Sequence, residues 1–236
     1  INIWIIMHIE SKKSNWTFKG TAKNFVAHAQ RSIPGYDQGH ELACKYSDFF
    51  CADSNTVIDV GSSTGLLLSK IAERHKDKDN LKLIGLEPVE DMYDFACDQM
   101  KDKRIELIND SIENTKLVKS NLLISYYTMQ FISPSIRQLM INKIYESLEW
   151  GGAFLFFEKV RASDARFQDH AIQIYNEFKI DNKFSEAEIM NKSESLKGVM
   201  EPFSTQGNLD LMKRAGFSDI QTIFKWVCFE GFIAIK

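Results

Sequence analysis

Short apolar runs alternate with longer segments of helical spacing through the middle of this chain. The short runs are typical of buried β-strands, and they lie at Val57–Val60, Leu81–Leu86, Ile105–Ile108, Leu122–Tyr127 and Ala153–Phe157. The helical segments between them lie at 64–76, 89–101 and 134–149. Strands that alternate with helices predict right-handed crossovers, and so a parallel sheet with helices on both faces.

The chain before this region is more polar. Residues 11–36 predict a loop with one short helix that ends in the turn Ile33-Pro34-Gly35-Tyr36, and residues 37–52 predict a further helix. After the core helix at 134–149, we expect Gly151 and Gly152 to end that helix and lead into the fifth strand.

The chain after the fifth strand changes its pattern. Residues 161–200 are charged and helical in pattern, which predicts an inserted helical lobe. A helix at 205–216 follows, and two apolar segments then predict an antiparallel strand pair, Ile220–Val227 and Phe229–Ile235. The expected units are an N-terminal extension with helices at 1–52, a core at 53–160, a helical insertion at 161–203, and a C-terminal helix and strand pair at 204–236.

Composition narrows the class of protein. A chain of 236 residues with 44% hydrophobic residues fits one α/β domain with an added lobe, or two small domains. A net charge of −3 argues against strong non-specific binding of nucleic acid. Four scattered cysteines indicate reduced thiols in a cytoplasmic protein, and five histidines show no metal-ligand spacing. Ile1–Met7 is too short to span a bilayer and lacks the features of a signal peptide, so no membrane partner is expected.

The segment most informative about function is the turn from Asp59 to Gly65. Gly61 ends the first strand, Ser62 and Ser63 follow, and Gly65 opens a helix. A strand, a tight turn and a helix N-terminus together build a site for a nucleotide or nucleoside. The turn is neither Gly-x-Gly-x-x-Gly nor a Walker sequence, which disfavours a dinucleotide and a nucleoside triphosphate.

Polar and aromatic residues follow the next three strands. Glu87, at the tip of the second strand, is placed to accept hydrogen bonds from ribose hydroxyls, or else is a solvated loop residue. Asp110, after the third strand, is placed to accept from an adenine amine or to cap the next turn. Tyr126, at the end of the fourth strand, either lines a sulfonium group or belongs to the core. Together these residues favour adenosine with a thioether or sulfonium tail over NAD.

This combination resembles the class I S-adenosylmethionine-dependent methyltransferases, and most closely the carboxy-S-adenosylmethionine synthases. The resemblance runs from Asn15 over nearly the whole chain, and its motifs are Asn15-Trp16-Thr17-Phe18, Gln30-Arg31-Ser32-Ile33-Pro34-Gly35-Tyr36, Asp59 to Gly65, Gly151-Gly152-Ala153 through Glu158-Lys159, Phe184 to Ile189, Val199-Met200 and Lys213 to Phe217. It implies a Rossmann-like fold with a mostly parallel seven-stranded sheet and a helical insertion after the fifth strand. It also implies a homodimer, with the insertion near the partner's site.

The resemblance further implies ligand contacts, with S-adenosylmethionine, S-adenosylhomocysteine or carboxy-S-adenosylmethionine as the cofactor. The implied cofactor-binding residues are Tyr36, Asp59, Gly61, Ser62, Ser63, Gly65, Glu87, Pro88, Asp110, Ser111 and Tyr126. Two positions depart from the family: its Asn at the end of the fourth strand is Tyr126 here, and its carboxylate-binding Arg is Ser193, next to Lys192.

In the resembled family, prephenate loses carbon dioxide as its ring aromatises, and the acidic methyl group of the cofactor captures it. The new carboxylate needs a fixed cation, which Ser193 cannot supply but Lys192, Arg161 or Arg166 can. The catalytic candidates are therefore Tyr126, Lys192 and Ser193. Two alternatives remain open, namely ordinary methyl transfer to a small molecule or an RNA nucleoside, and a cofactor-binding scaffold without catalysis.

Overall fold

The computed structural model describes residues 17–236. The expectations for Ile1–Met7 and for Asn15 and Trp16 therefore lie outside the described residues. The α-helices are α1 (Ala22–Ser32), α2 (Tyr36–Ser47), α3 (Leu66–Arg74), α4 (Glu90–Gln99), α5 (Pro134–Ser147), α6 (Ala165–Asp181), α7 (Glu186–Ser195) and α8 (Thr205–Ala215), and a short 3₁₀ helix covers Met129–Phe131. The strands are β1 (Thr56–Val60), β2 (Lys82–Leu86), β3 (Ile105–Ile108), β4 (Ser120–Tyr126), β5 (Leu148–Lys159), β6 (Asp219–Trp226) and β7 (Phe229–Ile235).

The seven strands form one sheet in the order β3-β2-β1-β4-β5-β7-β6. β1 to β5 are parallel, whereas β7 runs antiparallel to β5 and to β6. Strand order reverses between β1 and β4, so the carboxyl ends of these two strands flank the crevice where open α/β sheets bind ligands. The predicted sheet with its terminal antiparallel pair is confirmed.

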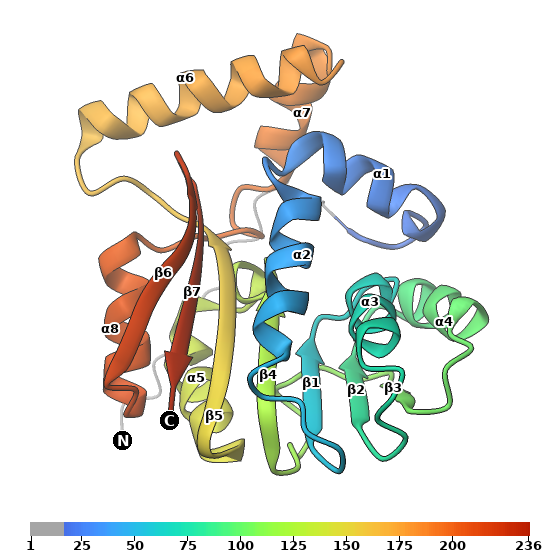
Figure 1. Cartoon of the computed structure of the whole chain (residues 1–236). Coiled ribbons are helices and arrows are strands. Elements are labelled where there is room, and N and C mark those ends of the chain that lie inside the picture. The colour runs from blue at the N-terminus through green and yellow to red at the C-terminus, as the bar shows by residue number, and fades with distance from the viewer. Residues whose placement is uncertain (1–16) are drawn as a thin grey trace, which may run out of the picture.

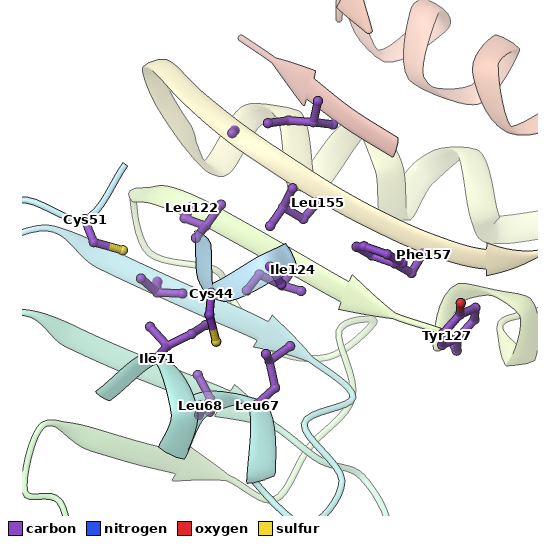
Figure 2. Close-up of a cluster of buried hydrophobic side chains, with 14 of the residues drawn as sticks. Cys44, Cys51, Leu67, Leu68, Ile71, Leu122, Ile124, Tyr127, Leu155 and Phe157 are labelled. Carbon is purple, nitrogen blue, oxygen red and sulfur yellow. The ribbon is translucent and has the colours of Figure 1, made fainter. Parts of the chain in front are cut away.

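Two apolar clusters cover the two faces of the sheet. On one face, Leu68 and Ile71 of α3 and Cys44 of α2 pack on Leu122 and Leu155 of the sheet (Figure 2). On the other face, the apolar side chains of α5 and α8 pack on the alternate residues of the same strands. Burial of these two clusters fixes the register of the strands, because a shift by one residue would move every apolar side chain to the wrong face.

The predicted end of the helix before β5 is wrong. α5 ends at Ser147, and Leu148 is already extended and pairs with Ser120 of β4. The register then jumps, because Leu122 pairs with Ala153, and Gly151 has a φ of 77° within the intervening bulge. The glycines therefore allow β5 to leave and rejoin its neighbour, rather than end a helix.

The inserted helices α6 and α7 lie beyond the carboxyl ends of the strands, and α6 crosses above the β6–β7 hairpin (Figure 1). The guanidinium of Arg31 in α1 donates to the carbonyl oxygens of Asn182 and Lys183 at 2.9 and 2.7 Å. The hydroxyl of Tyr175 in α6 donates to the carbonyl oxygen of Ser32 at 2.9 Å. The insertion is thus joined to α1. No helix among residues 17–236 is long and apolar enough to cross a membrane.

Candidate active site

The turn after β1 is shaped by its neighbours. The amides of Gly61 and Ser62 donate to the carbonyl oxygen of Leu86 at 2.8 and 2.9 Å, which fixes the turn beside the end of β2. Gly61 has a φ of 74°, and a Cβ built there would lie 2.3 Å from Oγ1 of Thr128. Gly65 also has a positive φ and precedes the first residue of α3. Both glycines occupy conformations that other residues rarely adopt.

Asp59 and Ser62 each have a buried oxygen near this turn that forms no hydrogen bond with the described residues. Among residues 17–236, no group hydrogen-bonds to Oδ1 of Asp59 or to Oγ of Ser62, and both side chains are buried. Burial, and to a lesser extent the nearby Glu87, raises the pKa of Asp59 to about 7. A buried carboxylate acceptor next to a free hydroxyl fits the charged ammonium tail of an amino-acid-bearing ligand.

Glu87 is buried, so the alternative that it is a solvated loop residue is wrong. Its two carboxylate oxygens accept from the amides of Ser63 and Val89, each at 2.8 Å. Burial nevertheless raises its pKa. The carboxylate therefore links the turn after β1 to the chain after β2, where parallel strands of this architecture place a ribose. Pro88, the next residue, is exposed.

Asp110 and Ser111 form a local turn after β3. Oδ1 of Asp110 accepts from the amide of Ser111 at 2.7 Å and from the side-chain amide of Asn114 at 3.0 Å. Asp110 therefore supports this turn through its side chain, although neither bond is that of an N-cap residue. The adenine contact of the pair stays a prediction.

An aromatic cluster joins α2 to the end of β4. The hydroxyl of Tyr126 donates to the carbonyl oxygen of Tyr36 at 2.6 Å, and the ring centroids of these tyrosines are 5.5 Å apart. The ring of His40 lies 4.5 Å from that of Tyr36 and 4.6 Å from that of Tyr126. Burial, with a smaller effect of Lys70, lowers the pKa of His40 to about 3, so its ring is neutral. His40 is not among the residues predicted for the site, although its position one helical turn after Tyr36 was a signal for it.

The next residue, Tyr127, has a φ of 61°, which is unusual for a bulky side chain. By strict alternation with Ser125 it would face α5, but its ring packs in the cluster on the α2 and α3 face (Figure 2). Its hydroxyl is buried and has no hydrogen-bond partner in the described part of the chain. Backbone strain and an unsatisfied hydroxyl thus coincide at the carboxyl end of β4.

The predicted catalytic residues of the insertion lie on α7. Nζ of Lys192 is 2.6 Å from Nε2 of His28 in α1, and burial, followed by Lys179, lowers the pKa of Lys192 to about 8. Ser193 is exposed, as are Arg161 and Arg166. The structure thus brings together the residues on β1, β2, β4 and α2, and connects Lys192 to α1.

The described residues contain no group of three or more metal-ligating side chains placed to hold an ion. Two surface hollows, of about 310 and 650 Å³, lie beside α4 and at the amino ends of the strands, away from the crevice.

Comparisons with known proteins agree with the geometry. Residues 57–152 match a family described as a methyltransferase domain. The carboxy-S-adenosyl-L-methionine synthase of Staphylococcus epidermidis is 34% identical over 223 residues, covering 94% of this chain and 97% of that protein. The protein of the same name from Nautilia profundicola is 36% identical over 208 residues, covering 87% and 88%.

A solved structure shares the fold. It is an S-adenosylmethionine-dependent methyltransferase of Thermotoga maritima, described as a possible histamine N-methyltransferase. The TM-score is 0.58 at 19% sequence identity, and the match covers 93% of this chain and 97% of that one.

Proposed function

The chain belongs to the carboxy-S-adenosyl-L-methionine synthase family, and from that membership we propose that it carboxylates the methyl group of S-adenosylmethionine with prephenate as the carboxyl donor. The observation that carries this proposal is similarity over 94% of the chain, which includes the insertion as well as the common core. The Rossmann-like class I methyltransferase fold is confirmed, and the protein is an S-adenosylmethionine-dependent transferase.

The residues around the carboxyl ends of β1 and β2 fit this cofactor. Asp59 and Ser62 have unsatisfied buried oxygens that suit its amino-acid tail, and Glu87 is a buried carboxylate that would contact the ribose. Asp110 and Ser111 would contact adenine, while Tyr36 and Tyr126 would line the sulfonium end. Neutral aromatic walls suit a cationic sulfonium, because a ring face attracts positive charge.

In the proposed reaction, the prephenate ring aromatises by losing one carboxyl group as carbon dioxide and its ring hydroxyl as hydroxide. The bound cofactor supplies the acidic methyl carbon that bonds to the carbon dioxide, and its methyl proton leaves with the hydroxide as water. The products are phenylpyruvate, water and a carboxymethyl donor. We place this donor upstream of wobble-uridine modification in tRNA, with the enzyme in the cytoplasm.

Incubation of the protein with S-adenosylmethionine, with and without prephenate, tests the proposal. We expect phenylpyruvate to appear only with both substrates, together with a cofactor heavier by one carbon dioxide. Formation of S-adenosylhomocysteine with an added acceptor would instead support methyl transfer, and cofactor binding without either product would support a scaffold. Glu87→Gln should lower turnover, whereas the matched change Glu90→Gln, at an exposed residue of α4, should not.

We also propose that the protein is a homodimer that uses the exposed apolar side chains of its insertion. Large apolar side chains are exposed there, namely Phe167, Ile172, Ile174 and Ile180 on α6 and Met190 on α7. Exposed apolar patches of this kind mark interaction surfaces. Light scattering after size-exclusion chromatography should give the mass of two chains for the wild type and of one chain for Ile172→Glu. A monomeric wild type would exclude the dimer.

A further inference from the structure

Two lysines contact the same aromatic ring at the carboxyl end of β5. Lys159 is the last residue of β5, and alternation with Leu155 and Phe157 places it on the α2 and α3 face of the sheet. Its Nζ lies 4.4 Å from the ring centroid of Tyr175 in α6. Nζ of Lys179, one turn later on α6, lies 4.3 Å from the same centroid. The two ammonium groups therefore share one ring.

The charges of this pair are poorly compensated. Burial lowers the pKa of Lys159, with a smaller effect of Arg161, and burial followed by Lys159 lowers the pKa of Lys179 to about 8. Within residues 17–236, neither lysine forms an ion pair with a carboxylate. The nearby thiol of Cys228 is no counter-ion, because burial raises its pKa. Two like charges repel each other in a partly desolvated environment, and an anion that pairs with both would relieve that repulsion.

An unsatisfied donor lies on the same side of the site. The ring of Tyr127 lies 5.7 Å from that of Phe229, and Nζ of Lys159 lies 5.9 Å from the Phe229 centroid. The Tyr127 hydroxyl is buried, and no described residue hydrogen-bonds to it. The hydroxyl of Tyr175 is already used, because it donates to Ser32. Tyr127 thus places an unsatisfied hydroxyl in the aromatic cluster that Lys159 also contacts.

The position of this group relates it to the cofactor crevice. Tyr127 directly follows Tyr126, and their ring centroids are 4.8 Å apart. Lys159, on β5, therefore lies on the far side of the β4 end from Glu87 and the turn after β1, and Lys179 of the insertion contacts the same ring. A second substrate that approaches the cofactor from the β4–β5 side would therefore reach this group.

We propose that Lys159, Lys179 and the hydroxyl of Tyr127 form the binding site for the carboxylates of an acidic second substrate. Two ammonium groups match a dicarboxylate, and a phenol donor adds a third hydrogen bond. This inference rests on the proposed function, since prephenate carries two carboxylates. It also assigns the binding of carboxylates to residues of β5 and α6 rather than to Lys192, Arg161 or Arg166.

The test measures steady-state kinetics and binding on the full chain with Lys159→Met, Lys179→Gln and Tyr127→Phe. Lys159→Met retains the apolar stem, so that loss of packing is small. We expect KM for prephenate to rise about 10- to 100-fold in each lysine variant, the range for losing a hydrogen bond to a charged group, while affinity for S-adenosylmethionine stays unchanged. Lys179→Arg should restore most of the loss, and Lys213→Gln, at an exposed lysine of α8, should cause none.

Calorimetry with homophthalate, an aromatic dicarboxylate that cannot lose carbon dioxide by aromatisation, separates this inference from the reaction. Lysine-dependent binding of homophthalate by a protein that forms no carboxylated cofactor would support the site and overturn the proposed function. Normal turnover with an unchanged KM in both lysine variants would overturn the site and leave the function standing. Absence of binding of prephenate and of homophthalate by the wild type would also overturn the site.

Discussion

Replacement of Asp59 by Asn should stabilise the ligand-free protein at alkaline pH. Burial, followed by Glu87, raises the pKa of Asp59 from 3.8 to about 7. As pH rises through this interval, the unfolded chain releases the proton first and the folded chain retains it. Folded stability therefore falls with rising pH, and Asn, which cannot ionise, avoids that loss.

The size of this change in the free energy of unfolding follows from the shift in the pKa of Asp59. Three pKa units at about 1.36 kcal/mol each give about 4 kcal/mol once the folded carboxyl has ionised. Between about pH 5 and pH 8, the free energy of unfolding of Asp59→Asn minus that of the wild type should grow by about 3 kcal/mol. Glu87 titrates in both proteins, so its own contribution largely cancels in this difference.

Urea unfolding without ligand, followed by circular dichroism at both pH values, measures this difference. Asp94→Asn, at an exposed position of α4, is the matched control and should give a pH-independent difference near zero. A difference for Asp59→Asn that does not change with pH would refute the reasoning, because it would place the pKa of Asp59 in the ordinary range. Calorimetry at pH 8 should show weaker binding of S-adenosylmethionine, since the variant lacks the buried charge.

Three further changes test the crevice. Glu87→Ala should weaken S-adenosylmethionine binding by about 1–3 kcal/mol in calorimetry, the scale of hydrogen bonds to a charged group, and an unchanged affinity would remove this residue from the site. Gly61→Ala should lower the thermal midpoint and abolish cofactor binding, because its Cβ would meet Thr128 at 2.3 Å, and wild-type behaviour would contradict the close approach. Tyr126→Phe should lower the free energy of unfolding by about 1 kcal/mol through loss of the bond to the Tyr36 carbonyl, and chemical denaturation that detects no change would show that this bond contributes nothing.

Local pattern determined the order of elements and the position of the crevice. The five core strands coincide with short apolar runs, which identify them without knowledge of their neighbours. The turn at Gly61 and Gly65 can also be predicted from the sequence, because a positive φ angle restricts the residue type locally. The end of α5 was misjudged, since Gly151 serves a bulge that depends on the pairing of β4 with β5.

Only the tertiary structure decided which distant side chains meet. The carboxylate of Glu87 accepts hydrogen bonds from amides in two separate turns. The contact of His40 with Tyr126 joins α2 to β4. Lys159 and Lys179 share a ring only because the insertion crosses the carboxyl end of β5. Their sequence neighbours give no sign of this arrangement, because charge repulsion and desolvation arise from distances in space, and chain folding alone sets those distances.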